Sequence, residues 1–150
     1  MKRYFKVAGL SAVLMAVSVL SLAAAELIPA VDDTELLGQH LYKDKNLSYF
    51  VNQSCQTCHN PLAGFTDRSN FLHPYDKMVS LGSDGMSLGG RNAPSSAYAG
   101  YSPALHLEGE EWFGGMFWDG RMDGSVLGDP LAEHAQGPPL NEIEMAMPCK

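Results

Sequence analysis

The sequence is short of basic residues. Its 10 Lys and Arg stand against 17 Asp and Glu, and its formal net charge at pH 7 is −7. Nucleic-acid binding needs clustered Lys and Arg to neutralise phosphates, so this balance argues against a nucleic-acid partner, while a basic partner protein remains compatible with it. Internal repeats and low-complexity tracts are lacking too. After residue 25 no apolar run has the length of a membrane span, and we expect no stable span.

Residues 1–25 have the composition of an export signal. Basic residues at the start precede an apolar run over 7–22, and alanines at 23–25 offer a small-residue cleavage site. We therefore expect 1–25 to be a cleaved signal peptide, with an uncleaved anchor as the alternative. Residues 26–150 would then form one periplasmic domain. They hold 7 basic and 17 acidic residues, a formal net charge of −10.

Cysteines are scarce as well, with three in the chain: Cys55, Cys58 and Cys149. An exported protein invites a disulfide interpretation. Cys55, Cys58 and His59 instead have the C-x-x-C-H spacing of c-type haem attachment, in which the thiols bind the haem vinyl groups and the histidine becomes an axial iron ligand. Zinc would need four ligands, and a redox dithiol would need a strand before it and a helix after it. These remain the two alternatives, and Cys149 has no assigned role.

Glycine and proline are plentiful, at 15 and 9 residues, and they predict long loops around few elements. Residues 61–94 are expected to form one long irregular loop. A chain with so little regular structure buries little apolar surface of its own, so a bound group would help to hold it together. We expect an all-α fold, a cytochrome c-like haem domain with long irregular loops.

Local patterns place the expected elements. Asp32 and Glu35 have the spacing of a capping box and predict a helix over 32–44. Asp129 before Pro130 predicts a helix that ends before Gly137. Further expectations are a brief helical turn at the cysteines, a short helix over 95–101 and a hairpin over 104–118, which turns at Gly109 or at the glycines 114–115.

Six motifs follow one another over residues 37–147: "LGQHLYKDKNLS", "SCQTCHNPLAGFTD", "VSLGSDG", "GGRNAPSSAYAGYSP", "FWDGRMD" and "AEHAQGPPLNEIEMAM". In this order they resemble the N-terminal haem domain of the bacterial diheme cytochrome c peroxidase and MauG family. The resemblance implies an enzyme that reduces hydrogen peroxide at a haem c, with electrons from a small periplasmic cytochrome or cupredoxin. Family members carry two haem domains, each with its own C-x-x-C-H. This chain has one such motif, so a second haem domain, which would form half of the electron route, is expected but absent.

The resemblance also assigns roles to single residues. Glu144 is the acid–base residue, although Asn141-x-x-Glu144 is also a helix-start pattern. His134 stands where the family has a glutamine of the same pocket. Trp118 corresponds to the tryptophan on the electron path between two haems. Two further assignments are Arg121 as a partner of a haem propionate, or of a surface carboxylate, and Asn92 as a calcium ligand.

The face of the iron opposite His59 is expected to be open. Some family members place a distal histidine after the stretch that matches "VSLG", but Ser83 and Asp84 stand there in this chain, as in the MauG-like branch. An open position is what peroxide requires. The alternatives are ligands from the same loop, for which we considered His73, Met78 and Met86.

Three other functions are compatible with the sequence. One is a mono-haem electron-transfer cytochrome c, which needs a sixth ligand on the iron. Another is a MauG-like enzyme that oxidises a protein side chain. The third is an inactive remnant that binds haem or a partner without turnover.

Overall fold

The computed structural model describes residues 31–148 of the chain. The expected signal peptide at 1–25 and Cys149 lie outside these residues. Contacts divide the chain into two units, Met1–Leu36 and Leu37–Lys150. Of the first unit the structure describes residues 31–36. The second unit carries every residue of the candidate site.

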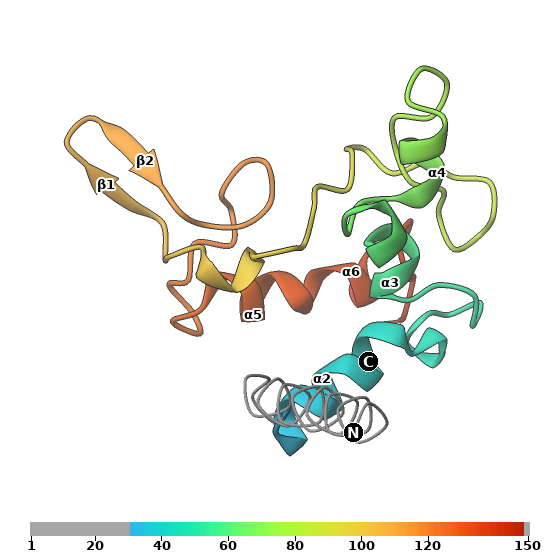
Figure 1. The fold of residues 1–150 in the computed structure, drawn as a ribbon, viewed down its shortest axis with the longest axis horizontal. Coiled ribbons are helices and arrows are strands. Elements are labelled where there is room, and N and C mark those ends of the chain that lie inside the picture. The colour runs from blue at the N-terminus through green and yellow to red at the C-terminus, as the bar shows by residue number, and fades with distance from the viewer. Residues whose placement is uncertain (1–30, 149–150) are drawn as a thin grey trace, which may run out of the picture. The chain divides into compact units, whose positions relative to one another are not determined.

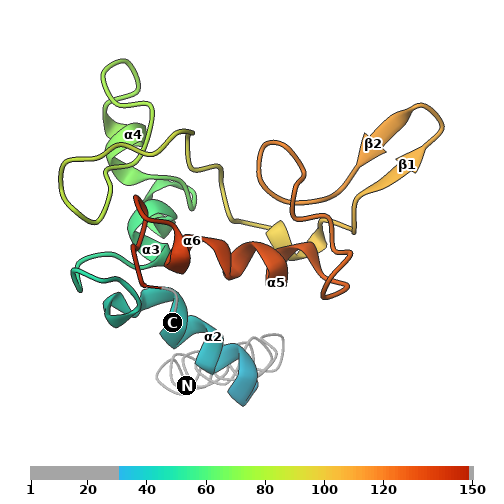
Figure 2. The same ribbon diagram turned by 180° about the vertical axis from the view of Figure 1, so that it is seen from behind.

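The elements are short and are joined by long loops (Figure 1, and from behind in Figure 2). In chain order the described elements are α2 (Asp33–Lys43), η1 (Lys45–Leu47), α3 (Cys55–Cys58), η2 (Pro61–Ala63), α4 (Arg68–Leu72), η3 (Ala99–Tyr101), β1 (His106–Glu108), β2 (Glu111–Phe113), α5 (Pro130–Ala135) and α6 (Gly137–Leu140).

Capping side chains set the helix boundaries, as the sequence predicted. In the capping box before α2, the Asp32 N–H donates to Glu35 Oε2 at 3.0 Å, and the Glu35 N–H donates to Asp32 Oδ1 at 2.8 Å. The Asp129 carboxylate accepts two N–H groups of the first turn of α5, and Pro130 occupies the first helical position. Both predicted helices are confirmed. Gly137 follows the end of α5 but begins a further helical turn, α6.

The all-α expectation is wrong. β1 and β2 form an antiparallel pair in which Leu107 faces Trp112, and Gly109 lies in the turn between the strands with a φ of +66°. A glycine adopts this left-handed conformation without strain, and aromatic residues favour strands, so a hairpin forms here. Of the two turns considered, the one at Gly109 is the one that forms.

The expected irregular loop over 61–94 also contains regular structure. Asp67 accepts the N–H groups of Ser69 and Asn70 and thereby begins the short helix α4, and Asn60 caps η2 in the same manner. These caps were present in the sequence, but the density of glycine and proline around them concealed the helical turns.

Few apolar side chains are buried in the described part of the chain. The buried ones are those of Ala63, at 5% exposure, Met145, at 3%, and Pro130. Buried polar side chains, by contrast, are numerous, and Ser48 and Ser83 are 1% exposed. Hydrogen bonds between loops therefore carry much of the internal organisation. The described residues contain no helix with both the length and the hydropathy to cross a membrane.

Candidate functional site

Helix α3 presents two thiols one helical turn apart. Thr57 fixes the start of the helix, since its hydroxyl accepts the Ser54 N–H at 3.0 Å, and the His59 N–H closes the turn by donating to the Cys55 carbonyl at 2.9 Å. Cys55 and Cys58 are half-buried and are not joined in a disulfide. Burial raises the pKa of both thiols. A redox dithiol requires a lowered thiol pKa, so this environment disfavours that alternative.

The zinc alternative lacks ligands. Among the described residues, no group of three or more His, Cys, Asp and Glu side chains is arranged to hold a metal ion. Structural zinc takes four such ligands. The Cys55–Cys58 pair with His59 therefore fits attachment of a haem better than it fits a protein-built metal site.

His59 is held with one ring nitrogen committed to backbone carbonyls. Its Nδ1 lies 2.9 Å from the Pro94 carbonyl and 3.2 Å from the Phe65 carbonyl. Because carbonyl oxygens only accept, Nδ1 carries the proton and Nε2 keeps its lone pair for a metal. An imidazole fixed in this manner is the usual form of a metal-ligating histidine. Sequence reasoning missed Pro94, although it is the last residue of the "RNAP" motif.

The carbonyl of the same histidine is also fixed. The Tyr42 hydroxyl of α2 donates to the His59 carbonyl at 2.9 Å and lies 2.9 Å from the Ser96 hydroxyl. Burial is the main cause that raises the pKa of Tyr42. Segments far apart in the sequence thus converge on His59 and fix its orientation.

His134 and Glu144 lie in the same electrostatic environment. Burial is the main cause that lowers the pKa of His134, and the charge of Arg121 lowers it further. Burial is also the main cause that raises the pKa of Glu144, and the charge of Arg121 acts in the opposite direction. Arg121 therefore acts electrostatically on both His134 and Glu144, which the sequence assigned to one pocket.

His134 is oriented by an aromatic stack. Its ring lies 4.0 Å from that of Phe117, centroid to centroid, and the guanidinium carbon of Arg121 lies 3.7 Å from the centre of the Phe117 ring. Phe117 thus packs against both the His134 imidazole and the Arg121 guanidinium. The Nδ1 atom of His134 is buried and has no hydrogen-bond partner among the residues that the structure describes. Phe117 adopts a φ of +61°, which is rare for a residue with a side chain.

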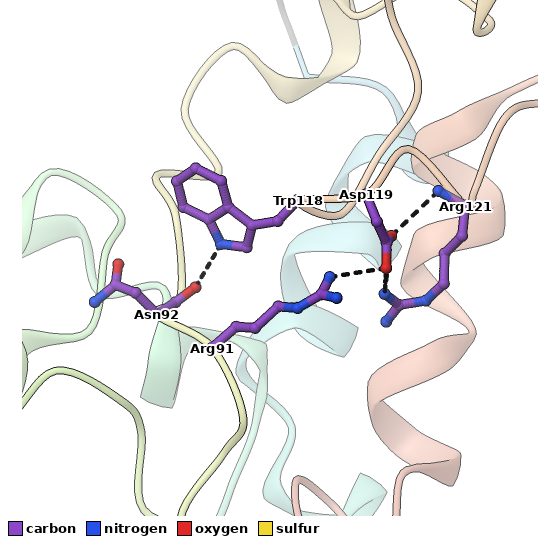
Figure 3. A network of polar contacts seen from close by, with 5 residues as sticks. All are labelled: Arg91, Asn92, Trp118, Asp119 and Arg121. Atoms are coloured by element: carbon purple, nitrogen blue, oxygen red, sulfur yellow. Dashed lines mark hydrogen bonds and ion pairs between the residues drawn. The ribbon is translucent and has the colours of Figure 1, made fainter.

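An ion-pair network holds the "FWDGR" loop against the "RNAP" loop (Figure 3). The Asp119 carboxylate accepts hydrogen bonds from Arg91 Nη1 at 2.9 Å and from Arg121 Nη1 at 2.8 Å. The hydrogen bond from Arg91 is the main cause that lowers the pKa of Asp119 to about 2, and the interactions with Arg121 lower it as well. The surface ion pair considered for Arg121 is therefore present. Its partner, Asp119, was not singled out in the sequence.

Trp118 and Asn92 lie in this network and contact each other (Figure 3). The indole N–H of Trp118 donates to the Asn92 backbone carbonyl at 2.9 Å, and the Asn92 side-chain amide donates to the Met78 carbonyl at 2.8 Å. The Trp118 residue as a whole is 65% exposed. It is therefore fixed at its nitrogen while much of its surface stays available to a partner.

The loop that follows "VSLG" is folded against the segment of Glu144. The Ser83 N–H donates to the carbonyls of Ile143, at 3.0 Å, and of Glu144, at 3.2 Å. Asp84 closes a tight turn by accepting two N–H groups of that turn. His73 is an exposed residue at the end of α4, and Met78 and Met86 are 66% and 82% exposed. Their exposure supports none of these three as a fixed ligand.

The described residues fit a large, flat and mostly apolar group. Leu62, beside the attachment helix, is 75% exposed, and apolar burial elsewhere in the unit is sparse. A domain of this length ordinarily buries many more apolar side chains. A porphyrin joined to Cys55 and Cys58 would cover such surface, with His59 Nε2 as the ligand of its iron and the orphaned His134 Nδ1 available as a polar partner.

Comparison with known proteins gives a consistent result. The family model of di-haem cytochrome c peroxidase matches residues 32–150. The methylamine utilization protein MauG of Paracoccus denitrificans is 43% identical over 121 residues, which cover 80% of this chain and 29% of that protein. The cytochrome c peroxidase Ccp of Escherichia coli is 34% identical over 110 residues, 73% of this chain and 18% of that protein.

A solved structure is similar as well. The diheme peroxidase BthA from Burkholderia thailandensis has a TM-score of 0.64 and 33% identity, over 80% of this chain and 28% of that one. The chain thus spans less than a third of the length of each of these relatives.

Proposed function

This chain belongs to the di-haem cytochrome c peroxidase family, and from that premise we propose that it is the domain in which hydrogen peroxide reacts. One haem c is attached to Cys55 and Cys58, with His59 as its axial ligand. When bound, the haem supplies a redox-active iron at which the O–O bond of peroxide is reduced. The net reaction consumes one peroxide, two electrons and two protons and yields two waters. The electrons come from a small periplasmic cytochrome or cupredoxin.

Glu144 carries the acid–base step of the proposal. Its carboxylate takes a proton from one peroxide oxygen and returns it to the oxygen that leaves. Burial raises the pKa of this carboxyl toward the working pH, where proton transfer in both directions is most effective. The observation that carries the proposal is this half-buried carboxyl in a unit that also presents His59 with its Nε2 available to a metal.

Three other residues have supporting roles in this proposal. His134 is held against Phe117 and, like Glu144, is influenced by the charge of Arg121. Trp118 lies on the electron path, and its N–H bond to the Asn92 carbonyl fixes its position. Arg121 keeps donors beyond its ion pair with Asp119 for a haem propionate. Calcium at Asn92 depends on oxygen ligands beyond this side chain, because one oxygen does not make a calcium site.

Export and assembly complete the proposal. Residues 1–25 direct the chain to the periplasm, where covalent haem attachment takes place. The relatives are more than three times as long as the matched region, and a second haem domain, on another chain or in a longer product, would deliver the electrons.

Oxidation of a protein side chain is the second candidate. It is favoured by the 43% identity to MauG and by Ser83 and Asp84, which occupy the place of a distal histidine and are bonded into a fixed turn. The two candidates share the peroxide step and differ in the electron source, so a reduced cytochrome and a purified protein substrate separate them.

The substitution Glu144→Gln tests the proposal. We expect the haem-loaded Glu144→Gln variant to react with hydrogen peroxide about 10²–10⁴-fold more slowly than the wild type in stopped-flow absorbance, because the proton carrier is lost. Glu142→Gln, an exposed carboxylate two residues away, is the matched control and keeps the wild-type rate. An unchanged rate in Glu144→Gln, or a wild-type haem that takes up neither cyanide nor peroxide, contradicts the proposal. The second result would instead indicate an electron-transfer cytochrome.

A further inference from the structure

The Asn141 side chain contacts Glu144 with both ends of its amide. Asn141 Oδ1 accepts the N–H groups of Ile143, at 2.9 Å, and of Glu144, at 3.2 Å. Because two backbone donors face the oxygen, the nitrogen must face the other way. There Nδ2 donates to Glu144 Oε1 at 3.3 Å. One side chain thus fixes the backbone of the turn and one oxygen of its carboxylate.

The other oxygen of that carboxylate is unoccupied by protein donors. Within residues 31–148, Glu144 Oε2 accepts no hydrogen bond. Holding Oε1 restricts rotation of the carboxylate and leaves Oε2 as the oxygen that exchanges a proton with a substrate. A carboxylate fixed at one oxygen is preorganised for such an exchange.

The backbone of the turn is anchored independently from the opposite side. The Ser83 N–H donates to the Ile143 and Glu144 carbonyls, and the Met145 carbonyl accepts the Tyr49 N–H at 2.8 Å. The approach is close enough that a Cβ on Gly82 would lie 2.7 Å from the Ile143 carbonyl oxygen. With the backbone held in this manner, rotation of the Glu144 side chain is the freedom that remains, and the Asn141 amide restricts it.

We propose that Asn141 is a positioning residue for Glu144, whose amide nitrogen holds one carboxylate oxygen so that the other faces the reacting peroxide. This inference rests on the proposed role of Glu144. Asn141 does not touch the substrate itself. It acts through the hydrogen bond from Nδ2 to Oε1 and through the turn that its Oδ1 caps.

Two substitutions separate these two functions. Asn141→Asp and Asn141→Ser both keep an oxygen that caps the turn, and both lose the Nδ2 donor. Asp also brings a second negative charge close to Glu144. The titratable or charged groups that act on Glu144 from other elements, His59 and Arg121, are unchanged in both variants. Loss of a donor to the ionised carboxylate, and addition of a like charge, both favour its protonated form.

The expected result has a kinetic and a spectroscopic part. In the full-length, haem-loaded protein, we expect both variants to react with peroxide at least about tenfold more slowly than the wild type. The reason is that a misplaced Glu144 carboxylate loses part of its general acid–base contribution. The acid limb of the pH–rate profile moves to higher pH. The titration of the Glu144 side-chain carboxyl, followed by ¹³C NMR of glutamate-labelled protein, moves in the same direction. A purely structural role would leave this titration unchanged once circular dichroism shows that the variant is folded.

The controls distinguish this inference from the proposed function. Asn46→Asp is the matched control, because the Asn46 amide in η1 also donates to a carboxylate, at Asp44 Oδ1. We expect this variant to keep the wild-type peroxide rate and the wild-type titration of Glu144. In a Glu144→Gln background, Asn141→Ser has no further effect on the rate.

Two outcomes overturn the inference. One is an unchanged Glu144 titration in both folded Asn141 variants. The other is an unchanged peroxide rate in these variants while Glu144→Gln is slow, which would leave the role of Glu144 intact. If Glu144→Gln itself retains the wild-type rate, the proposed acid–base role of Glu144 is wrong. A shifted titration in Asn141→Ser would then show that Asn141 contacts Glu144, without a role in the peroxide reaction.

Discussion

At the scale of single residues, the site depends on side chains that are oriented by hydrogen bonds and ion pairs to their neighbours. His59 commits Nδ1 to the carbonyls of Pro94 and Phe65 and keeps Nε2 free. Asp119 joins Arg91 to Arg121 and thereby fixes the loop of Trp118. The proposed haem ligand, His59, and the tryptophan proposed for the electron path, Trp118, are therefore oriented by neighbours to which the proposal gives no chemical role.

The Asp119 network predicts a pH-dependent loss of stability. Asp119 has a pKa of about 2 in the folded protein, against an ordinary value of 3.8. A lowered carboxyl pKa stabilises the folded state above the ordinary value, and this contribution disappears as the pH falls toward the lowered one. We expect Asp119→Asn to lower the melting temperature at pH 7 and to have almost no effect near the pKa of about 2.

Thermal denaturation followed by circular dichroism across this pH range checks that prediction. Glu110→Gln, in the hairpin turn, is the control, because Glu110 forms no ion pair with any residue in the part of the chain that the structure describes. An Asp119→Asn difference that is the same at every pH would mean that the carboxylate charge is not what stabilises the loop.

At the scale of elements, the loop over residues 80–88 is positioned by the close approach of its backbone to the backbone at Ile143. Gly82 is buried, and a Cβ there would lie 2.7 Å from the Ile143 carbonyl oxygen. A backbone oxygen held by other hydrogen bonds has little room to move. This contact therefore couples the loop to the turn that carries Glu144.

Two glycine-to-alanine substitutions test this coupling. Gly82→Ala should lower the free energy of unfolding by about 1–3 kcal/mol, because the added methyl group separates the two backbones. Gly38→Ala, in α2, has open space around the new Cβ and should raise it by up to about 1 kcal/mol through helix propensity. Urea denaturation measures both. Equal effects of the two substitutions would contradict the close approach at Gly82.

The elements that depend on local chemistry were predictable from the sequence. The capping box of Asp32 and Glu35 and the Asp129 cap each act within a few residues, and both are confirmed. The turn at Gly109 is one of the two that the sequence allowed. The all-α class was wrong because residues 106–108 and 111–113 pair as an antiparallel hairpin.

The contacts that organise the site were not predictable in the same way. Pro94 lies 35 residues from His59, and Asn92 lies 26 residues from Trp118. A hydrogen bond between segments so far apart depends on the path of the whole loop, which periodicity and capping patterns do not encode. The identities of His59, Trp118 and Glu144 as candidates came from the sequence, and their neighbours came from the structure.

At the scale of the whole molecule, the sequence is acidic, and the described residues are rich in loops and bury few apolar side chains. The proposed covalent haem would account for this composition, because it would supply an apolar centre for the loops.

The intact mass of the exported chain, produced in a host that matures c-type cytochromes, tests this claim most directly. The account predicts a polypeptide that carries one haem, retained after denaturation in acid, and a Cys55→Ala/Cys58→Ala variant that carries none. A wild-type chain with the mass of the bare polypeptide would contradict the account.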